Sequence, residues 1–128
     1  IHQSGHLARL SEENRELIGE AIEYYKKIRH LIKESYPFWP LGMPAFCDQR
    51  FALGFFNGEC AHLAVWRLED EREELELGLE EVEHPIASVE LAYPKHLPCS
   101  FRWEPQKRQL MVSQPKNSAR LFRIVYAE

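Results

Sequence analysis

The segment from Arg50 to Leu68 constrains the fold of this chain more than any other. Two runs rich in strand-forming residues, RFALGFF and ECAHLAVWRL, flank Asn57-Gly58, a dipeptide that tolerates the positive φ angles of a type I′ turn. The sequence therefore predicts a β-hairpin. If the loop is this dipeptide alone, the register is fixed and Phe55 lies opposite Cys60.

Both faces of the predicted hairpin are apolar. One face carries Phe51, Leu53, Phe55, Cys60, His62, Ala64 and Trp66, and the other carries Ala52, Gly54, Ala61, Leu63 and Val65. Because neither face is polar enough to remain in water, we expect the hairpin in the middle of a sheet. One face should pack on a second sheet and the other should lie under a helix or loop.

The remainder of the chain after the hairpin reads as further short strands. Residues 74–80, 88–93, 101–103, 109–113 and 119–127 are separated by charged turns or prolines. About seven strands at a spacing of roughly ten residues are typical of an antiparallel β-sandwich. We therefore predict a mainly β fold, Greek-key-like, preceded by one long N-terminal α-helix.

The N-terminal helix has clear signals at both ends. Ser11 is a suitable N-cap, acidic residues follow it, basic residues gather at the other end, and Pro37 ends the pattern. An apolar stripe runs along the helix and consists of Leu17, Ile18, Ala21, Ile22, Tyr25, Ile28, Leu31 and Ile32. Residues 37–45 then form a linker rich in proline and aromatic residues, so the predicted sandwich occupies 46–128.

Composition and charge exclude several classes of protein. The 128 residues are 45% hydrophobic with a net charge of -4, which suits one globular domain and gives no field that attracts nucleic acid or an anionic membrane. No apolar run approaches the roughly 20 residues of a membrane helix. Three widely spaced cysteines fit a reducing cytoplasm. The chain begins without methionine, and we expect a fragment of a larger protein.

The sequence offers little catalytic or metal-binding chemistry. The only aspartates, Asp48 and Asp70, border the hairpin, and no paired-carboxylate motif accompanies them. Cys60 and His62 share a strand face without the remaining ligands of a zinc site. We therefore predict no catalytic residue, no metal and no cofactor. The remaining candidate function is sugar binding, in which an exposed tryptophan ring would stack on a sugar ring.

A resemblance to a known family spans nearly the whole chain. It is carried, in order, by Ser4-Gly5-His6-Leu7, Ala21-Ile22, Tyr25-Lys26, Ile28-Arg29, Pro37 to Gly42, Ala52-Leu53-Gly54, Leu63 to Arg67, Tyr93-Pro94, Trp103 and Ala119 to Ile124. This succession resembles the C-terminal end of glycoside hydrolase family 36, the α-galactosidases or melibiases. Such enzymes have a (β/α)8 barrel followed by an antiparallel β-sandwich.

The resemblance implies that this chain is the non-catalytic part of a larger hydrolase. Residues 1–36 would be the end of the last barrel strand and the last barrel helix, 37–45 the linker, and 46–128 the C-terminal sandwich. The family's catalytic aspartates stand on earlier barrel strands in contexts that Asp48 and Asp70 do not share. Ser4, Gly5 and His6, just past the last strand, are the residues here that would line the rim of the sugar site.

Two functions of different classes follow. In the first, the chain is an inactive structural domain whose partner is the catalytic barrel of the same protein, with an α-galactoside as the parent's substrate. In the second, it is an independent carbohydrate-binding module that presents Trp39 or Trp103. A parent acting on another α-linked sugar stays open. An uncovered apolar helix face would also favour homo-oligomers.

Overall fold

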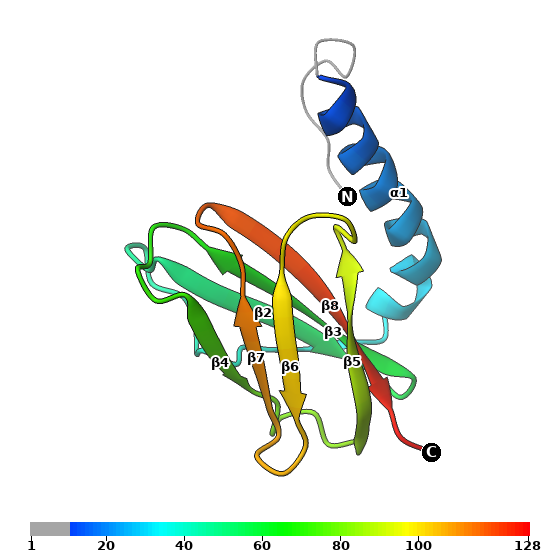
Figure 1. Cartoon of the computed structure of the whole chain (residues 1–128). Coiled ribbons are helices and arrows are strands. Elements are labelled where there is room, and N and C mark those ends of the chain that lie inside the picture. Colours follow the sequence, from blue (N-terminus) through cyan, green and yellow to red (C-terminus); the bar gives the residue numbers. More distant parts are fainter. Residues whose placement is uncertain (1–10) are drawn as a thin grey trace.

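The computed structural model describes residues 11–128, which form one helix and two packed β-sheets (Figure 1). Helix α1 spans Glu12–Ile32. The strands are β1 Tyr36–Phe38, β2 Arg50–Phe56, β3 Cys60–Arg67, β4 Glu74–Gly78, β5 Ile86–Tyr93, β6 Ser100–Glu104, β7 Gln109–Ser113 and β8 Ser118–Tyr126. The predicted mainly β architecture with one preceding helix is confirmed, with one strand more than the sequence indicated.

The strands divide unequally between the two sheets. The large sheet has the order β1-β2-β3-β8-β5 and the small sheet the order β4-β7-β6, and every pairing is antiparallel. The chain crosses between the sheets after β3, β4, β5 and β7. The hairpin β2-β3 therefore lies inside the large sheet, as its two apolar faces require.

The register of this hairpin corrects the prediction. Phe55 pairs with His62 and not with Cys60. The Asn57 N–H donates to the Cys60 carbonyl over 3.1 Å, so these two residues close the turn and its centre moves one residue along the chain. The cause is the Asn57 side chain, whose Oδ1 accepts from the backbone N–H groups of Glu59 and Cys60. A two-residue register change leaves each side chain on its predicted face.

The core lies between the two sheets and follows the alternation of each strand. Its fully or nearly buried members from the large sheet are Phe38, Ala52, Ala61, Leu63, Val65, Val89, Phe122 and Ile124, and those from the small sheet and its flanks are Leu75, Leu77, Leu79, Val82, Leu110 and Val112. The leucines that alternate with glutamate in and after β4 are buried, as their period of two predicts.

Strand β5 departs from simple alternation at its end. The pairing with β8 is irregular between Leu91 and Tyr93, and Ala92 is buried, although strict alternation from the exposed Ser88 and Glu90 would place it on their side of the strand. Tyr93 instead pairs with Leu121 on the outer face of the sheet. A bulge re-aims the side chains that follow it, which an alternating pattern cannot reveal.

The start of the predicted linker takes part in the large sheet. Pro37 and Phe38 belong to β1, an edge strand, where a proline removes no hydrogen bond that a neighbour needs. Phe38 is fully buried above Gly54. The rest of the linker is irregular, as are residues 46–49, which the sequence assigned to the sandwich, and this stretch exposes several apolar side chains, including Met43 and Phe46.

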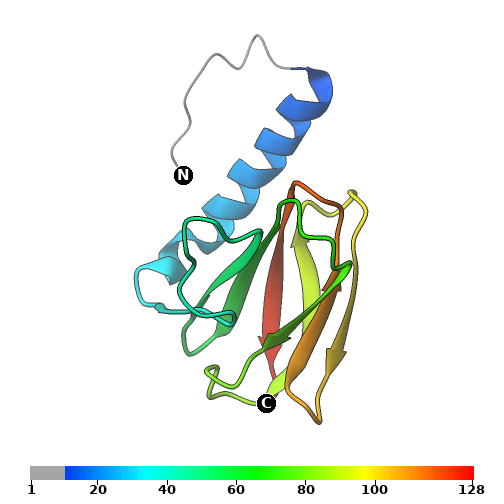
Figure 2. The same ribbon diagram turned by 90° about the vertical axis from the view of Figure 1, so that its left-hand side faces the viewer.

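Helix α1 lies on the outer side of the large sheet, away from the core (Figure 2). Its N-cap is Ser11, as predicted, and the Ser11 Oγ accepts from the Asn14 N–H over 3.2 Å. None of its residues is buried. Among the described residues, no helix is both long and apolar enough to span a membrane.

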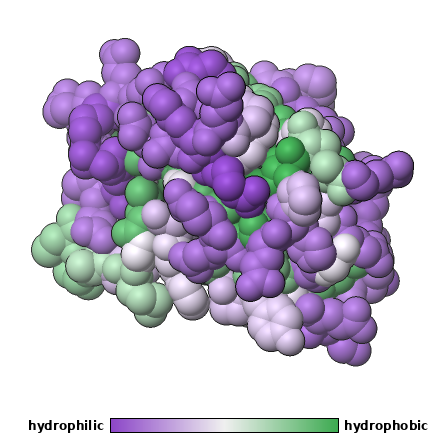
Figure 3. Space-filling model, turned by 90° about the horizontal axis from the view of Figure 1, so that it is seen from below, coloured by the Kyte–Doolittle hydropathy of each residue, from purple (hydrophilic) through white to green (hydrophobic). Residues whose placement is uncertain are grey.

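The molecule's exposed apolar side chains are unevenly distributed. The side seen in Figure 3 is mainly hydrophilic, with smaller hydrophobic areas between the polar residues. Within residues 11–128, the large hydrophobic residues that are exposed all lie between Ile32 and Leu53, from the end of α1 to β2, except Phe101. The apolar surface is therefore concentrated around the helix, the irregular loop and the neighbouring hairpin.

Candidate functional site on the outer face of the large sheet

The outer face of β2 and β3 is built from aromatic and small apolar side chains. Phe51 stacks on Trp66 with ring centres 5.0 Å apart, and Phe55 stacks on His62 at 5.1 Å. These pairs arise because facing residues of an antiparallel pair lie close together on one side of the sheet. The face is thus a layer of flat rings, whereas the opposite face of the same strands fills the core.

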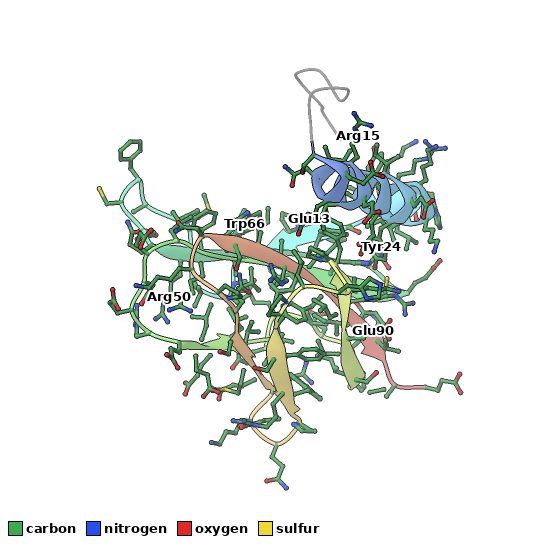
Figure 4. The ribbon with its side chains drawn as sticks, turned by 45° about the horizontal axis from the view of Figure 1, so that its top comes forward. Glu13, Arg15, Tyr24, Arg50, Trp66 and Glu90 are labelled. Carbon is green, nitrogen blue, oxygen red and sulfur yellow. The ribbon has the colours of Figure 1, made fainter. Side chains whose placement is uncertain are left out.

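Two tyrosine hydroxyls tie α1 to this face. The Tyr24 hydroxyl lies 2.6 Å from the His62 Nε2 atom, and the Tyr93 hydroxyl donates to the Leu17 carbonyl over 2.8 Å. Tyr24 projects from the side of α1 that faces the sheet (Figure 4). Each tyrosine presents its ring to an apolar surface and its hydroxyl to a buried or half-buried polar group.

An apolar groove separates the helix from the sheet beside these contacts. It has a volume of about 220 Å³. Its lining consists of Ala21, Tyr24, Tyr25, Ile28 and Ile32 from α1 and Phe55, Tyr93 and Leu121 from the sheet. The helix therefore touches the sheet along one line and does not seal the face, which explains why none of its residues is buried.

The Tyr24–His62 pair has unusual electrostatics. Burial and, to a lesser degree, the positive charge of Arg123 lower the pKa of His62 to about 4. Burial raises the pKa of Tyr24 to about 12, although Arg123 acts in the opposite direction. Both groups are therefore neutral at pH 7. They form an uncharged hydrogen bond in a site where either charge would be poorly solvated.

A second polar cluster surrounds Asp70, at the end of the hairpin opposite its turn. Hydrogen bonds from the Arg72 guanidinium and backbone N–H, with the nearby charge of Arg50, lower the pKa of Asp70 to about 2. Arg50 lies on the left of Figure 4, away from α1. Because this carboxylate is ionised and engaged by two arginines, it is unsuited to proton donation. The Asp48 Oδ2 accepts from the Ala45 N–H and closes its own loop.

The two tryptophans predicted to stack on sugar belong to different parts of the sandwich. Trp39 follows β1 of the large sheet and is half-buried. Trp103 lies in β6 of the small sheet, packs against the core, and has a buried indole N–H without a partner among the described residues. The two rings therefore do not form one platform, and Trp103 presents only part of its surface to solvent.

The predicted rim residues Ser4, Gly5 and His6 lie outside the described residues. In residues 11–128, no three or more histidine, cysteine, aspartate or glutamate side chains are placed to hold a metal ion. The three cysteines are free, and Cys60 is buried two residues from His62.

The sequence patterns missed the partnership between Tyr24 and His62. Each residue places a polar group beside apolar side chains: Tyr24 lies next to the apolar stripe of the helix, and His62 lies on an apolar face of a strand. A buried tyrosine hydroxyl and a buried imidazole each require a hydrogen-bond partner. That signal was present, but only the packing of α1 on β3 identified the pair.

Comparison of the chain with protein-family models, with curated proteins and with solved structures found no match in any of the three.

Proposed function

We propose that this chain is the C-terminal accessory part of an α-galactosidase-like glycoside hydrolase, whose catalytic barrel is its partner. The parent would hydrolyse terminal α-galactosides with retention of configuration. The sandwich and α1 would support the barrel and contribute no reacting group beyond the rim residues Ser4, Gly5 and His6. The observation that carries this proposal is the apolar stripe of α1, a 21-residue helix without a buried residue.

The apolar stripe of α1 is wider than the part of the helix that faces the sheet. Ile18 and Ile22 belong to the stripe but not to the groove lining. At about 100° per residue, Ile22 lies roughly 120° around the helix axis from Ile28, which does line the groove. A helix with apolar residues over so wide an arc is normally covered on more than one side. The last helix of a barrel meets this description, because barrel strands would cover the second side.

The loop after β1 supports the same proposal. Met43 is 74% exposed and Phe46 is 104% exposed, in the loop that lies against Arg50 and Asp70 at the end of the hairpin. Large apolar side chains that are this exposed often mark a surface that another protein layer covers. In the proposed parent, this loop and α1 would rest on the barrel.

The aspartates of the chain also fit a supporting role. A retaining glycosidase needs two carboxyl groups about 5 Å apart, one as nucleophile and one as acid and base. Asp70 is held ionised by Arg50 and Arg72, and Asp48 closes its own loop. We therefore place the catalytic pair in the barrel.

The test combines an activity assay with a measurement of association. The purified chain should not cleave p-nitrophenyl α-galactoside above the blank, and sedimentation should show self-association that Ile22→Lys reduces. Glu23→Lys, which adds positive charge on the exposed side of α1, is the matched control and should leave association unchanged. Cleavage that is lost in Asp48→Asn or Asp70→Asn would overturn the proposal.

Two further measurements separate the alternatives. Saturable quenching of tryptophan fluorescence by galactose or melibiose, lost in Trp39→Ala or Trp103→Ala, would favour an independent carbohydrate-binding module. The residues encoded upstream of Ile1 test the parentage directly. Alternating strands and helices with two catalytic aspartates are expected, and an unrelated domain there would refute the proposal.

A further inference from the structure

The attachment of α1 depends on a buried histidine. His62 is 1% exposed, and the covering groups are the Tyr24 hydroxyl at 2.6 Å and the Phe55 ring at 5.1 Å. The core of the sandwich lies on the other side of β3. Helix α1 can therefore leave the sheet without opening the core, and its departure would expose His62 to water.

Burial and the nearby guanidinium of Arg123 disfavour a positive charge on His62. Strand β8 contributes the guanidinium of Arg123, which is paired with Glu90 of β5 over 3.1 Å. Strand β3 contributes the buried thiol of Cys60, α1 the neutral Tyr24 hydroxyl, and β2 an aromatic ring. The carboxylate of Glu90 is thus already engaged by Arg123. Glu90 lies on β5, beyond Tyr24 as seen from α1 (Figure 4).

The hydrogen bonds of His62 lead to the same conclusion. An imidazolium donates from both ring nitrogens. The Nδ1 atom is buried and has no partner among the described residues. In the neutral ring, Nε2 can either accept from the Tyr24 hydroxyl or donate to it. In the imidazolium, Nε2 can only donate, and Nδ1–H becomes an unsatisfied buried donor on a charged ring, which costs more than on a neutral one. A buried donor without an acceptor is costly, whereas water would satisfy it once the helix has moved.

We propose that α1 is a pH-sensitive strap, seated on the large sheet while His62 is neutral and released when His62 takes up a proton. The strap is built into residues 11–128, so the inference holds whether or not the chain belongs to a glycosidase.

The direction and size of the effect follow from proton linkage. The pKa of His62 is about 4 with α1 seated, against 6.5 for the free side chain. Seating is therefore fully favoured above about pH 6.5 and weakens as the pH falls toward 4. Between pH 7 and pH 5 the seating equilibrium should shift toward release by up to about twenty-fold, the limit in which the exposed His62 titrates as a free side chain although Arg123 stays beside it.

Amide hydrogen exchange on the whole chain tests the proposal. Protection factors, corrected for the intrinsic exchange rate at each pH, should fall for residues 17–32 between pH 7 and pH 5. Those of the central amides of β3 and β8 should stay unchanged. In the same samples, the NMR titration of the His62 Cε1–H should be displaced well below the range of an exposed histidine. Constant protection of α1, or a His62 that titrates as an exposed histidine does, would overturn the inference.

Variants separate His62 from the other titrating groups. His62→Gln keeps a polar side chain that does not titrate, and should make the protection of α1 independent of pH. His30→Gln removes an exposed histidine from α1 itself and should leave the pH dependence intact. Tyr24→Phe removes only the hydroxyl and should lower α1 protection already at pH 7. If His62→Gln does not fold, the native titration and Tyr24→Phe decide: unaltered α1 protection in Tyr24→Phe would count against the strap.

Discussion

A methyl group added at Gly54 should disturb the packing of β1 on β2. Gly54 faces Phe38 across the two strands, and a Cβ atom built on it would overlap the Cζ and Cε1 atoms of the Phe38 ring. It would lie 2.9 Å from Cδ1, whereas ordinary van der Waals contact begins at 3.4 Å. Phe38 is fully buried and packs against the Phe56 ring at 5.9 Å, so the ring has little room to withdraw.

The magnitude follows from two opposing effects. Inserting a methyl group into a well-packed core typically costs about 1–3 kcal/mol. Replacing glycine with alanine at a compatible backbone conformation stabilises by about 0.4–1 kcal/mol, because the unfolded chain loses freedom. The overlap at Gly54 involves several ring atoms, so the upper part of the first range applies. We expect Gly54→Ala to lower the free energy of unfolding by roughly 1–2 kcal/mol.

Urea unfolding followed by circular dichroism measures this change, and Gly19→Ala is the matched control. Gly19 lies in the exposed middle of α1, and a Cβ there meets nothing within 4 Å. Gly19→Ala should therefore raise the free energy of unfolding or leave it unchanged. In a Phe38→Leu background, which shortens the clashing side chain, Gly54→Ala should cost less. Equal effects of alanine at Gly19 and Gly54 would refute the steric argument.

Three further substitutions test other features of the structure. Leu77→Ala, at a fully buried core position, should cost about 2–5 kcal/mol by urea unfolding, whereas Leu53→Ala, at a site 39% exposed, should cost far less; equal costs would contradict the assigned core. Asn57→Ala should cost about 1 kcal/mol, because the turn loses the Asn57 Oδ1 as acceptor for two backbone N–H groups, while Asn14→Ala, whose side chain is exposed on α1, should be close to neutral. Asp70→Asn should be less stable than the native chain near neutral pH. Because the pKa of Asp70 is about 2 in the folded chain against 3.8 in a free side chain, this difference should shrink as the pH falls from about 4 to 2, and a constant difference in unfolding curves across that range would disprove the role of Arg50 and Arg72.

Local patterns predicted most of the elements of this fold. Ser11, the acidic residues after it and the apolar stripe located α1, because capping and helical period depend on neighbours in sequence. The alternation of leucine and glutamate in β4 located a half-buried strand and its buried side. These features require no knowledge of what lies across the sheet.

The errors occurred where a side chain or a distant strand changed the backbone. Asn57 accepts two backbone hydrogen bonds and so moves the turn of the hairpin, which a dipeptide rule does not include. The irregular pairing of β5 with β8 turns Tyr93 outward and buries Ala92. Edge strand β1 forms although Pro37 lies in it, because only one side of an edge strand needs hydrogen bonds.

The candidate site also combines features that the sequence predicts with contacts that only the tertiary structure reveals. The sequence by itself determined that the chain has an amphipathic helix and a hairpin with two apolar faces, because hydrophobic periodicity is a local property. Only the tertiary structure decided that Tyr24 meets His62, 38 residues further along the chain, and that Arg123 and Glu90 stand beside them. Such contacts depend on which strands become neighbours and where the helix comes to lie. Both are set by packing over the whole chain, and no short segment encodes them.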